Sequence, residues 1–321
     1  MTALLAAAYF LLGGINAIII LLHLLIFWLL CDLIFFILRK AGAICPDRRI
    51  YRAGLTAVII TVLYLGYGWY SDRHVVITQY TVTSDKVTEP LRIVQFSDSH
   101  MGTTFDGEGF ARHMETVNAL DPDIILITGD YVDGSSLDED IITATDALST
   151  LSSTYGTYFC FGNHDKNAYG EEDSRQIKTP QLIEMLQAAG VTVLEDEVVQ
   201  ITDEYTLIGR RDLTETRLSA AELAAQADAS TFIIDMNHQP NDYDNEAAAG
   251  FDLVLSGHTH GGQFFPIQNA GVWLGQNDRT YGYEQRGNTN FIVSSGISDW
   301  AIDFKTGCVS EIVVIEVVPQ D

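Results

Sequence analysis

Short polar clusters that combine Asp, Asn and His with Gly recur through the chain, and they contain five of its eight histidines. In order, they are Asp98-Ser99-His100, Gly129-Asp130-Tyr131-Val132-Asp133, Gly162-Asn163-His164-Asp165, His238, and Gly257-His258-Thr259-His260. Mixed imidazole and carboxylate ligands suit Mn, Fe or Zn rather than Ca. The clusters therefore predict a ligand set for two divalent metal ions.

Two of the clusters hold a pair of ligand-type residues one position apart. In extended backbone, residues i and i+2 point to the same side. Asp98 and His100 can therefore reach one ion, and so can His258 and His260. The glycines of the clusters allow sharp turns and a close approach of the backbone to the ions.

Hydrolysis at a two-metal site needs a carboxylate shared between the ions and a proton donor for the leaving alkoxide. Asp130, which follows a glycine in the second cluster, is placed to bridge. Asn163 offers a neutral amide oxygen that moderates the negative charge. His164, next to Asn163, is placed to donate the proton.

Apolar runs of strand length alternate with stretches of helical period, which indicates an α/β architecture. The expected strands are 75–82, 91–96, 124–128, 157–161, 205–209, 232–235, 253–256, 291–294 and 312–317. The expected helices are 109–120, 141–151, 180–189 and 220–227, and a hairpin is expected near 195–205. Four polar clusters directly follow a strand, at the edge where α/β sheets build their sites.

The motifs resemble those of the calcineurin-like metallophosphoesterase superfamily, which run D-x-H, G-D-x-x-D, G-N-H-[DE], H and G-H-x-H. All five are present in order between Asp98 and His260. The segments 237–240 and 257–263 look most like the membrane-associated or exported bacterial phosphodiesterase branch. The resemblance covers about 75–317 and implies a four-layer αββα sandwich (α/β, or α+β by some schemes).

The resemblance also implies roles for single residues. One metal would be held by Asp98, His100, Asp130 and His260, and the other by Asp130, Asn163, His238 and His258. His164 would orient the phosphate and protonate the leaving group. Asp133 would support a histidine ligand without binding the metal itself.

The residues that contact substrate are less defined. Arg210 and Arg211 follow an apolar strand and could grip a substrate phosphate, or they could form an ordinary surface ion-pair cluster. Some members of the branch have an arginine-containing segment near the C-terminus, but residues 298–305 contain no Arg. Trp300 and Phe304 either line a lipid or nucleoside pocket or, as is commoner, belong to the core.

The first part of the chain is apolar. Between residues 3 and 38 the only charged residue is Asp32, so this run is long enough to cross a membrane once, over about 15–38. A second run covers about 53–70 and ends in an aromatic group typical of a membrane interface. The alternatives are core helices of a soluble protein or a cleaved signal peptide, which the length and the uncharged N-terminus disfavour.

Cations gather between the two apolar runs, at Arg39, Lys40, Arg48, Arg49 and Arg52. Short cation-rich loops stay in the cytoplasm. We therefore expect residues 1–73 to be a two-helix membrane anchor. The catalytic domain, residues 74–321, should then lie outside the cytoplasm.

Residues 74–321 are strongly acidic, with 12 Lys and Arg against 40 Asp and Glu. A domain of this charge repels polyanions, so no nucleic-acid partner is expected. The four cysteines contain no C-x-x-C pair, which argues against a Cys-ligated zinc. Cys160 and Cys308 are either buried free thiols, the commoner case, or a disulfide.

The sequence therefore predicts a metal-dependent phosphoester hydrolase of a cell membrane, and by resemblance a phosphodiesterase rather than a phosphomonoesterase. The anchor suggests a lipid-linked or cell-envelope phosphoester as substrate. The alternative is a metal-binding membrane receptor or scaffold without catalysis. A transporter is disfavoured because two spans with few ionisable residues leave no pathway.

Overall fold

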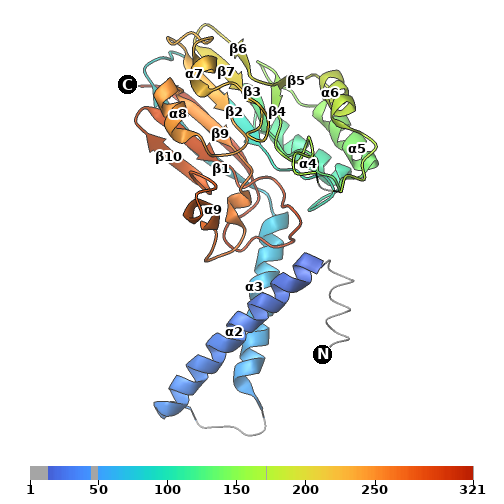
Figure 1. The fold of residues 1–321 in the computed structure, drawn as a ribbon, viewed down its shortest axis with the longest axis vertical. Coiled ribbons are helices and arrows are strands. Elements are labelled where there is room, and N and C mark those ends of the chain that lie inside the picture. The colour runs from blue at the N-terminus through green and yellow to red at the C-terminus, as the bar shows by residue number, and fades with distance from the viewer. Residues whose placement is uncertain (1–13, 45–49, 171, 321) are drawn as a thin grey trace.

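The computed structural model describes residues 14–44, 50–170 and 172–320, in which two long helices extend from a head that contains the sheets (Figure 1). They are α2 (Gly14–Lys40) and α3 (Arg52–Arg73). Both are long and apolar enough to cross a membrane, with mean hydropathy 2.8 and 1.4. The predicted runs 15–38 and 53–70 lie inside them. Cys45, Arg48 and Arg49 lie outside the described residues.

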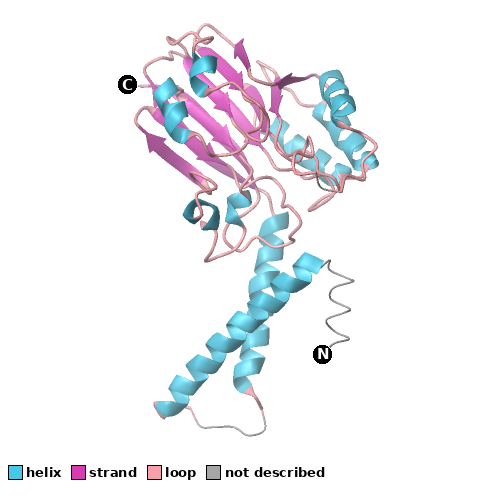
Figure 2. Cartoon of the chain, viewed as in Figure 1, coloured by secondary structure: helices cyan, strands magenta, loops and turns pink. Residues whose placement is uncertain are grey.

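Two six-stranded sheets form the centre of the head (Figure 2). In spatial order, the first contains β1 (Val76–Ser84), β12 (Glu311–Pro319), β2 (Leu91–Phe96), β3 (Ile124–Thr128), β4 (Thr157–Cys160) and β5 (Val191–Leu194). The second contains β10 (Gly282–Arg286), β11 (Thr289–Val293), β9 (Leu253–Ser256), β8 (Phe232–Met236), β7 (Tyr205–Gly209) and β6 (Glu197–Gln200). In the first sheet β2, β3, β4 and β5 are parallel, and so are β7, β8, β9 and β11 in the second.

Three separate apolar clusters hold four layers together. Between the sheets, Leu126 of the first packs in one cluster with Leu207 and Ile234 of the second. The outer face of the first sheet is covered by α4 (Gly107–Ala119), α5 (Asp138–Leu148) and α6 (Thr179–Ala188). The second sheet is covered by α7 (Ala220–Ala224) and α8 (Tyr243–Ala249). The predicted αββα sandwich is confirmed.

The predicted elements recur with small changes at their ends, and the predicted hairpin is β6 with β7. Helix α4 begins where Asp106 accepts a hydrogen bond from the Gly109 N–H at 2.8 Å, which caps its first turn. The sequence did not predict β5, β10, α8 or the short elements η1 (His260–Gly262) and α9 (Ala270–Trp273). Cys160 and Cys308 are free.

The head is attached to the helices by polar contacts as well as by the chain. Asn16 of α2 donates from Nδ2 to Asp303 at 3.0 Å and accepts from the Asp303 N–H at 3.0 Å. The Lys305 N–H donates to the Gly68 carbonyl of α3 at 3.0 Å. The segment around residues 300–305 therefore rests on the ends of both helices.

Candidate metal centre

Loops from both sheets meet at one edge of the sandwich. Asp98, Asp130 and Asn163 follow β2, β3 and β4 of the first sheet, and His238 and His258 follow β8 and β9 of the second. Because these strands are parallel within each sheet, their carboxyl ends lie at the same edge. The two sheets thus supply opposite sides of one site.

Within this site, two groups of three side chains are close enough to hold a metal ion. The ligand atoms of each group lie within 4.8 Å of one another. The groups are Asp98 with His100 and His260, and Asp130 with His238 and His258. The resemblance assigned each of these groups to one metal ion, and its further ligands, Asn163 and a shared Asp130, stay predictions.

The Asp130 carboxylate lies between the two groups. Its Oδ2 is 3.1 Å from His238 Nε2 in its own group and 3.6 Å from His100 Nε2 in the other. Its Oδ1 accepts a hydrogen bond from the His164 N–H at 2.9 Å. This is the position that a shared ligand requires.

Three histidines have an acceptor oxygen next to Nδ1. His238 Nδ1 donates to the Thr128 carbonyl at 2.7 Å. His100 Nδ1 lies 3.3 Å from the Asp133 carboxylate, and His260 Nδ1 lies 3.3 Å from the Ser298 carbonyl. A partner at Nδ1 fixes the ring and leaves Nε2 free to bind a metal. The role of Asp133 as the partner of a ligand histidine stays a prediction, and His100 is the histidine that lies beside it.

The backbone of the site is strained. Five of the candidate ligands have φ in the left-handed region, which costs about 1–3 kcal/mol for a residue with a side chain. They are Asp98 (55°), His100 (37°), Asp130 (52°), His258 (70°) and His260 (47°). A Cβ at Gly162 or Gly257 would collide with the Asp130 or Asp98 carboxylate, so the glycines are required by close approach.

Burial and neighbouring charges both shift the pKa values of the ionisable groups in the site. Burial lowers the pKa of His238, but Asp130 outweighs this effect and raises it to about 10. Burial and the charge of His238 lower the pKa of His258 to about 4. Burial raises the pKa of Asp98, although His238 opposes the shift. The ionisable groups of the site are therefore strongly coupled to one another, with His238 and Asp130 as the central pair.

Buried polar atoms without a protein partner show that the residues fit metal ions. Asn163 is buried, and neither its Oδ1 nor its Nδ2 has a hydrogen-bond partner. Such atoms are costly unless a ligand satisfies them. An Asn oxygen and an imidazole nitrogen are both donors for Mn, Fe or Zn.

Comparison with known proteins agrees with this geometry. The model of the calcineurin-like phosphoesterase family matches residues 91–262. The chain belongs to this family. It is 28% identical to a metallophosphoesterase of Helicobacter pylori (strain J99 / ATCC 700824), over 86% of this chain and 74% of that protein. It is also 28% identical to a transmembrane protein with metallophosphoesterase domain of Bos taurus, over 85% of this chain and 64% of that protein.

Among solved structures, the head is similar to a dimetal phosphatase from Danio rerio, with TM-score 0.40 and 11% identity. The match covers 65% of this chain and 88% of that one. The chain is similar in the same way to a 5'-nucleotidase precursor from Thermus thermophilus, with TM-score 0.39 and 14% identity, over 72% of this chain and 54% of that one.

Asp165, the last residue of the family motif G-N-H-[DE], received no role from the sequence, but the structure shows what it does. Its carboxylate accepts four backbone N–H groups, at 2.8–3.1 Å, from Asp130, Tyr131, Val132 and Gly162. Asp165 therefore ties the loop after β3 to the loop after β4. Burial and the Asp130 charge raise its pKa to about 7.

His164 lies at the mouth of the site and is half-buried. Its ring centroid is 5.1 Å from that of His100 and 5.0 Å from that of Trp300. Trp300 and Asp133 line an adjoining cavity of about 160 Å³. Trp300 therefore belongs to the rim of the site and not to the core of the phosphoesterase.

The structure corrects the expectation that Arg210 grips a substrate phosphate. Its guanidinium is buried, and Nη1 lies 2.8 Å from Glu246 and 2.9 Å from Asp242. Arg210 is thus paired with the carboxylates of Asp242 and Glu246 and not with the candidate metal centre. Arg211 differs, because its side chain is exposed while its N–H donates to Asp196 at 3.0 Å.

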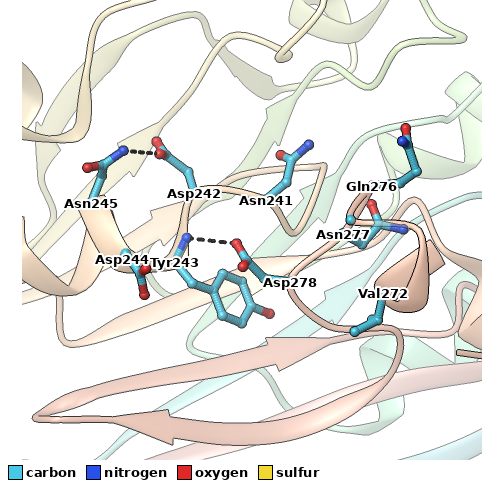
Figure 3. Close-up of a pocket in the computed structure, with 10 residues that line it drawn as sticks. Asn241, Asp242, Tyr243, Asp244, Asn245, Val272, Gln276, Asn277 and Asp278 are labelled. Carbon is cyan, nitrogen blue, oxygen red and sulfur yellow. Dashed lines mark hydrogen bonds between the residues drawn. The ribbon is translucent and has the colours of Figure 1, made fainter.

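A larger cavity, of about 400 Å³, lies beside α8 and α9 and is lined by Asp242, Tyr243 and Asp278 (Figure 3). There the Tyr243 N–H donates to Asp278 at 3.1 Å. None of the candidate metal ligands lines this cavity. The candidate metal centre is therefore separate from this cavity.

Proposed function

We propose that the protein is a binuclear, metal-dependent phosphodiesterase of a cell membrane. The observation that carries the proposal is the position of Asp130 between two separate groups of ligand-type side chains. A single metal ion would need only one of these groups. The preference for diesters rests on the resemblance to the membrane-associated or exported branch.

In this proposal the residues divide as the family motifs suggest. One ion would be held by Asp98, His100, Asp130 and His260, and the other by Asp130, Asn163, His238 and His258. Two divalent ions bound there would supply Lewis-acid activation of water and charge neutralisation of the phosphoryl oxygens. Their identity is Mn, Zn or Fe by the chemistry of the donors.

His164 is the residue that we propose to protonate the leaving alkoxide. It contacts the bridging carboxylate through its backbone, so its ring is positioned by the same loop that positions the ions. Its half-buried place at the rim lets it meet a substrate that enters from solvent. Asp133 would orient the His100 ring and keep Nε2 toward the ions.

The site would work at the outer face of a cytoplasmic membrane. Residues 1–73 would be the anchor, because α2 and α3 satisfy the length and hydropathy of membrane spans. Residues 74–321 would be the catalytic domain, and the cations between the helices favour its outward orientation. A lipid-linked or cell-envelope phosphoester is then the substrate class within reach, and nucleic acid is disfavoured by the acidic head.

Substrate profiling of the full chain in detergent tests the proposal. The chain would be stripped with chelator, reloaded with Mn²⁺, Zn²⁺ or Fe²⁺, and assayed on bis-nitrophenyl phosphate, nitrophenyl phosphate and phospholipids. We expect metal-dependent hydrolysis, with two ions bound per chain and faster cleavage of diesters. Two bound ions with no hydrolysis of any phosphoester would instead identify a metal-binding scaffold. Faster cleavage of the monoester would overturn the diester preference alone.

A further inference from the structure

The segment Gly261–Asn277, which follows His260 of the metal centre, is unusual for this head. It contains no charged residue, although residues 74–321 carry 40 Asp and Glu. Four of its large apolar side chains are exposed, namely Phe265 (59%), Ile267 (55%), Trp273 (67%) and Leu274 (74%). Exposed apolar side chains gathered in one segment mark a surface that meets a partner or a membrane.

The same segment contacts the two long helices. The Phe264 ring lies 5.4 Å from His23 of α2, and the Phe265 carbonyl accepts a hydrogen bond from the Tyr64 hydroxyl of α3 at 3.1 Å. Figure 1 shows α9, within this segment, at the end of the head nearest to α3. The exposed apolar side chains therefore gather beside the helices and not on a remote face.

These contacts give the depth of the segment along each helix. His23 lies nine residues from the start of α2 at Gly14, and Tyr64 lies nine residues from the end of α3 at Arg73. At the rise of an α-helix, nine residues span roughly 14 Å. Both helices thus place the segment at the same depth, well inside their outer ends.

The length of α3 indicates that a position at that depth lies in the membrane and not in water. Its 22 residues, from Arg52 to Arg73, span roughly 33 Å, which is close to the thickness of about 30 Å of a bilayer core. With Arg52 at the inner boundary, Tyr64 lies roughly 18 Å further out, which is inside an apolar layer of about 30 Å. The occupant that fits beside the segment is therefore lipid.

We infer that the loop Phe264–Leu274 enters the outer leaflet of the bilayer beside α2 and α3, so that the head lies on the membrane surface. This inference rests on the proposed membrane anchor. Its consequence is that the metal centre, four residues before Phe264 at His260, stands next to the lipid headgroups. A phosphoester lipid could then reach the site without leaving the bilayer.

Depth-dependent quenching of Trp273 tests the inference without any hydrolysis. The full chain would be placed in nanodiscs of phosphatidylcholine brominated either near the headgroup end or near the terminus of the acyl chain. The emission of a Trp273→Phe variant is subtracted to isolate Trp273. Interfacial segments lie roughly 5–10 Å into the headgroup–acyl boundary, so we expect the shallow bromines to remove about half of the Trp273 emission.

A transplanted tryptophan provides the matched control. Ile142, on α5 of the outer helical layer, is 47% exposed. In a Trp273→Phe, Ile142→Trp variant, the new tryptophan should keep its emission in brominated discs and be quenched by aqueous iodide. Emission from Trp273 that is equally insensitive to bromine, with the chain retained in the disc, would overturn the inference. A chain that does not remain in the disc would overturn the anchor as well, and the two failures are distinguished by co-elution with lipid.

Discussion

At the scale of single residues, neighbouring acceptor groups orient the imidazole rings of the candidate ligands. His100, His238 and His260 each have Nδ1 next to an acceptor, which leaves Nε2 toward the carboxylates. His164 differs, because it reaches the site from the rim beside Trp300. Substitutions should therefore separate metal binding from proton transfer.

Replacement of His164 tests proton transfer. We expect His164→Ala to lower kcat on an alkyl phosphodiester about 10²–10⁴-fold, because the leaving alkoxide loses its acid. On a nitrophenyl diester the loss should be much smaller, because nitrophenolate leaves without a proton. The measurement is steady-state kinetics on both substrates, with metal content by elemental analysis. His113→Ala, on α4, is the control, and an equal loss on both diesters would rule out the acid role.

Replacement of Asp133 tests whether its carboxylate helps His100 to bind a metal ion. Asp133→Asn keeps the shape of the side chain but removes the charge beside His100 Nδ1. We expect the affinity for metal to fall about 10–100-fold, as is usual for such partners. Titration of the stripped protein with Mn²⁺ or Zn²⁺ measures it. Exposed Asp146→Asn on α5 should bind as the wild type does, and unchanged affinity in Asp133→Asn would contradict the role.

The candidate ligands could be proposed from the sequence because they stand in ordered motifs. The sequence left Arg210 open between a substrate contact and an ion-pair cluster, because the carboxylate partners of Arg210 lie 32 and 36 residues later in the chain. It also gave Asp165 no role, since hydrogen bonds to four backbone N–H groups leave no pattern in side-chain types. The sequence alone did not show these contacts, because they join segments that are far apart in the chain.

At the scale of elements, the carboxyl ends of the strands set the positions of the candidate ligands. Strands β2, β3, β7 and β9 agree with their predicted ranges because each is mostly apolar and almost entirely buried. Edge strand β10 was not predicted, since Gly282–Arg286 alternates between partly buried and exposed polar residues. Helix α8 was not predicted either, and it brings Glu246 to Arg210.

Strand β8 contains a group that should make stability depend on pH. Asp235 is fully buried, and both of its carboxylate oxygens lack a hydrogen-bond partner. Burial raises the pKa of Asp235 well above its usual value, although Arg210 opposes the shift. The unfolded chain therefore releases this proton at a lower pH than the folded chain, and stability falls as pH rises above about 4.

We expect Asp235→Asn to remove part of this fall. Between about pH 5 and pH 8, the thermal midpoint of the wild type should drop more than that of the variant, by roughly 2–4 °C for each kcal/mol of difference. Thermal melts of the full chain in detergent measure it. Exposed Asp203→Asn should follow the wild type. A variant that is less stable than the wild type at every pH would show that the Asp235 charge is needed.

At the scale of the whole molecule, the two helices and the head form one unit. Asn16 and Arg73, near the outer ends of α2 and α3, both contact Asp303. The segment that carries Asp303 also carries Trp300 at the rim of the site. In the proposed membrane anchor, these contacts would fix the position of the site, and the direction in which the helices cross would decide which compartment it faces.

The direction of crossing gives the last prediction. The cations between the helices should keep the segment 41–51 in the cytoplasm and place both the N-terminus and the head outside. A phosphatase reporter that is active only outside the cytoplasm should therefore give signal when fused after Asp321 and none when fused after Ala43. A fluorescent protein that folds only in the cytoplasm should give the opposite pattern at the same two positions. Exchange of Arg39, Lys40 and Arg52 for Glu should weaken this asymmetry. A cytoplasmic pattern at Asp321 in the unchanged chain would place the metal centre inside the cell, and a substrate of the outer leaflet would then be excluded.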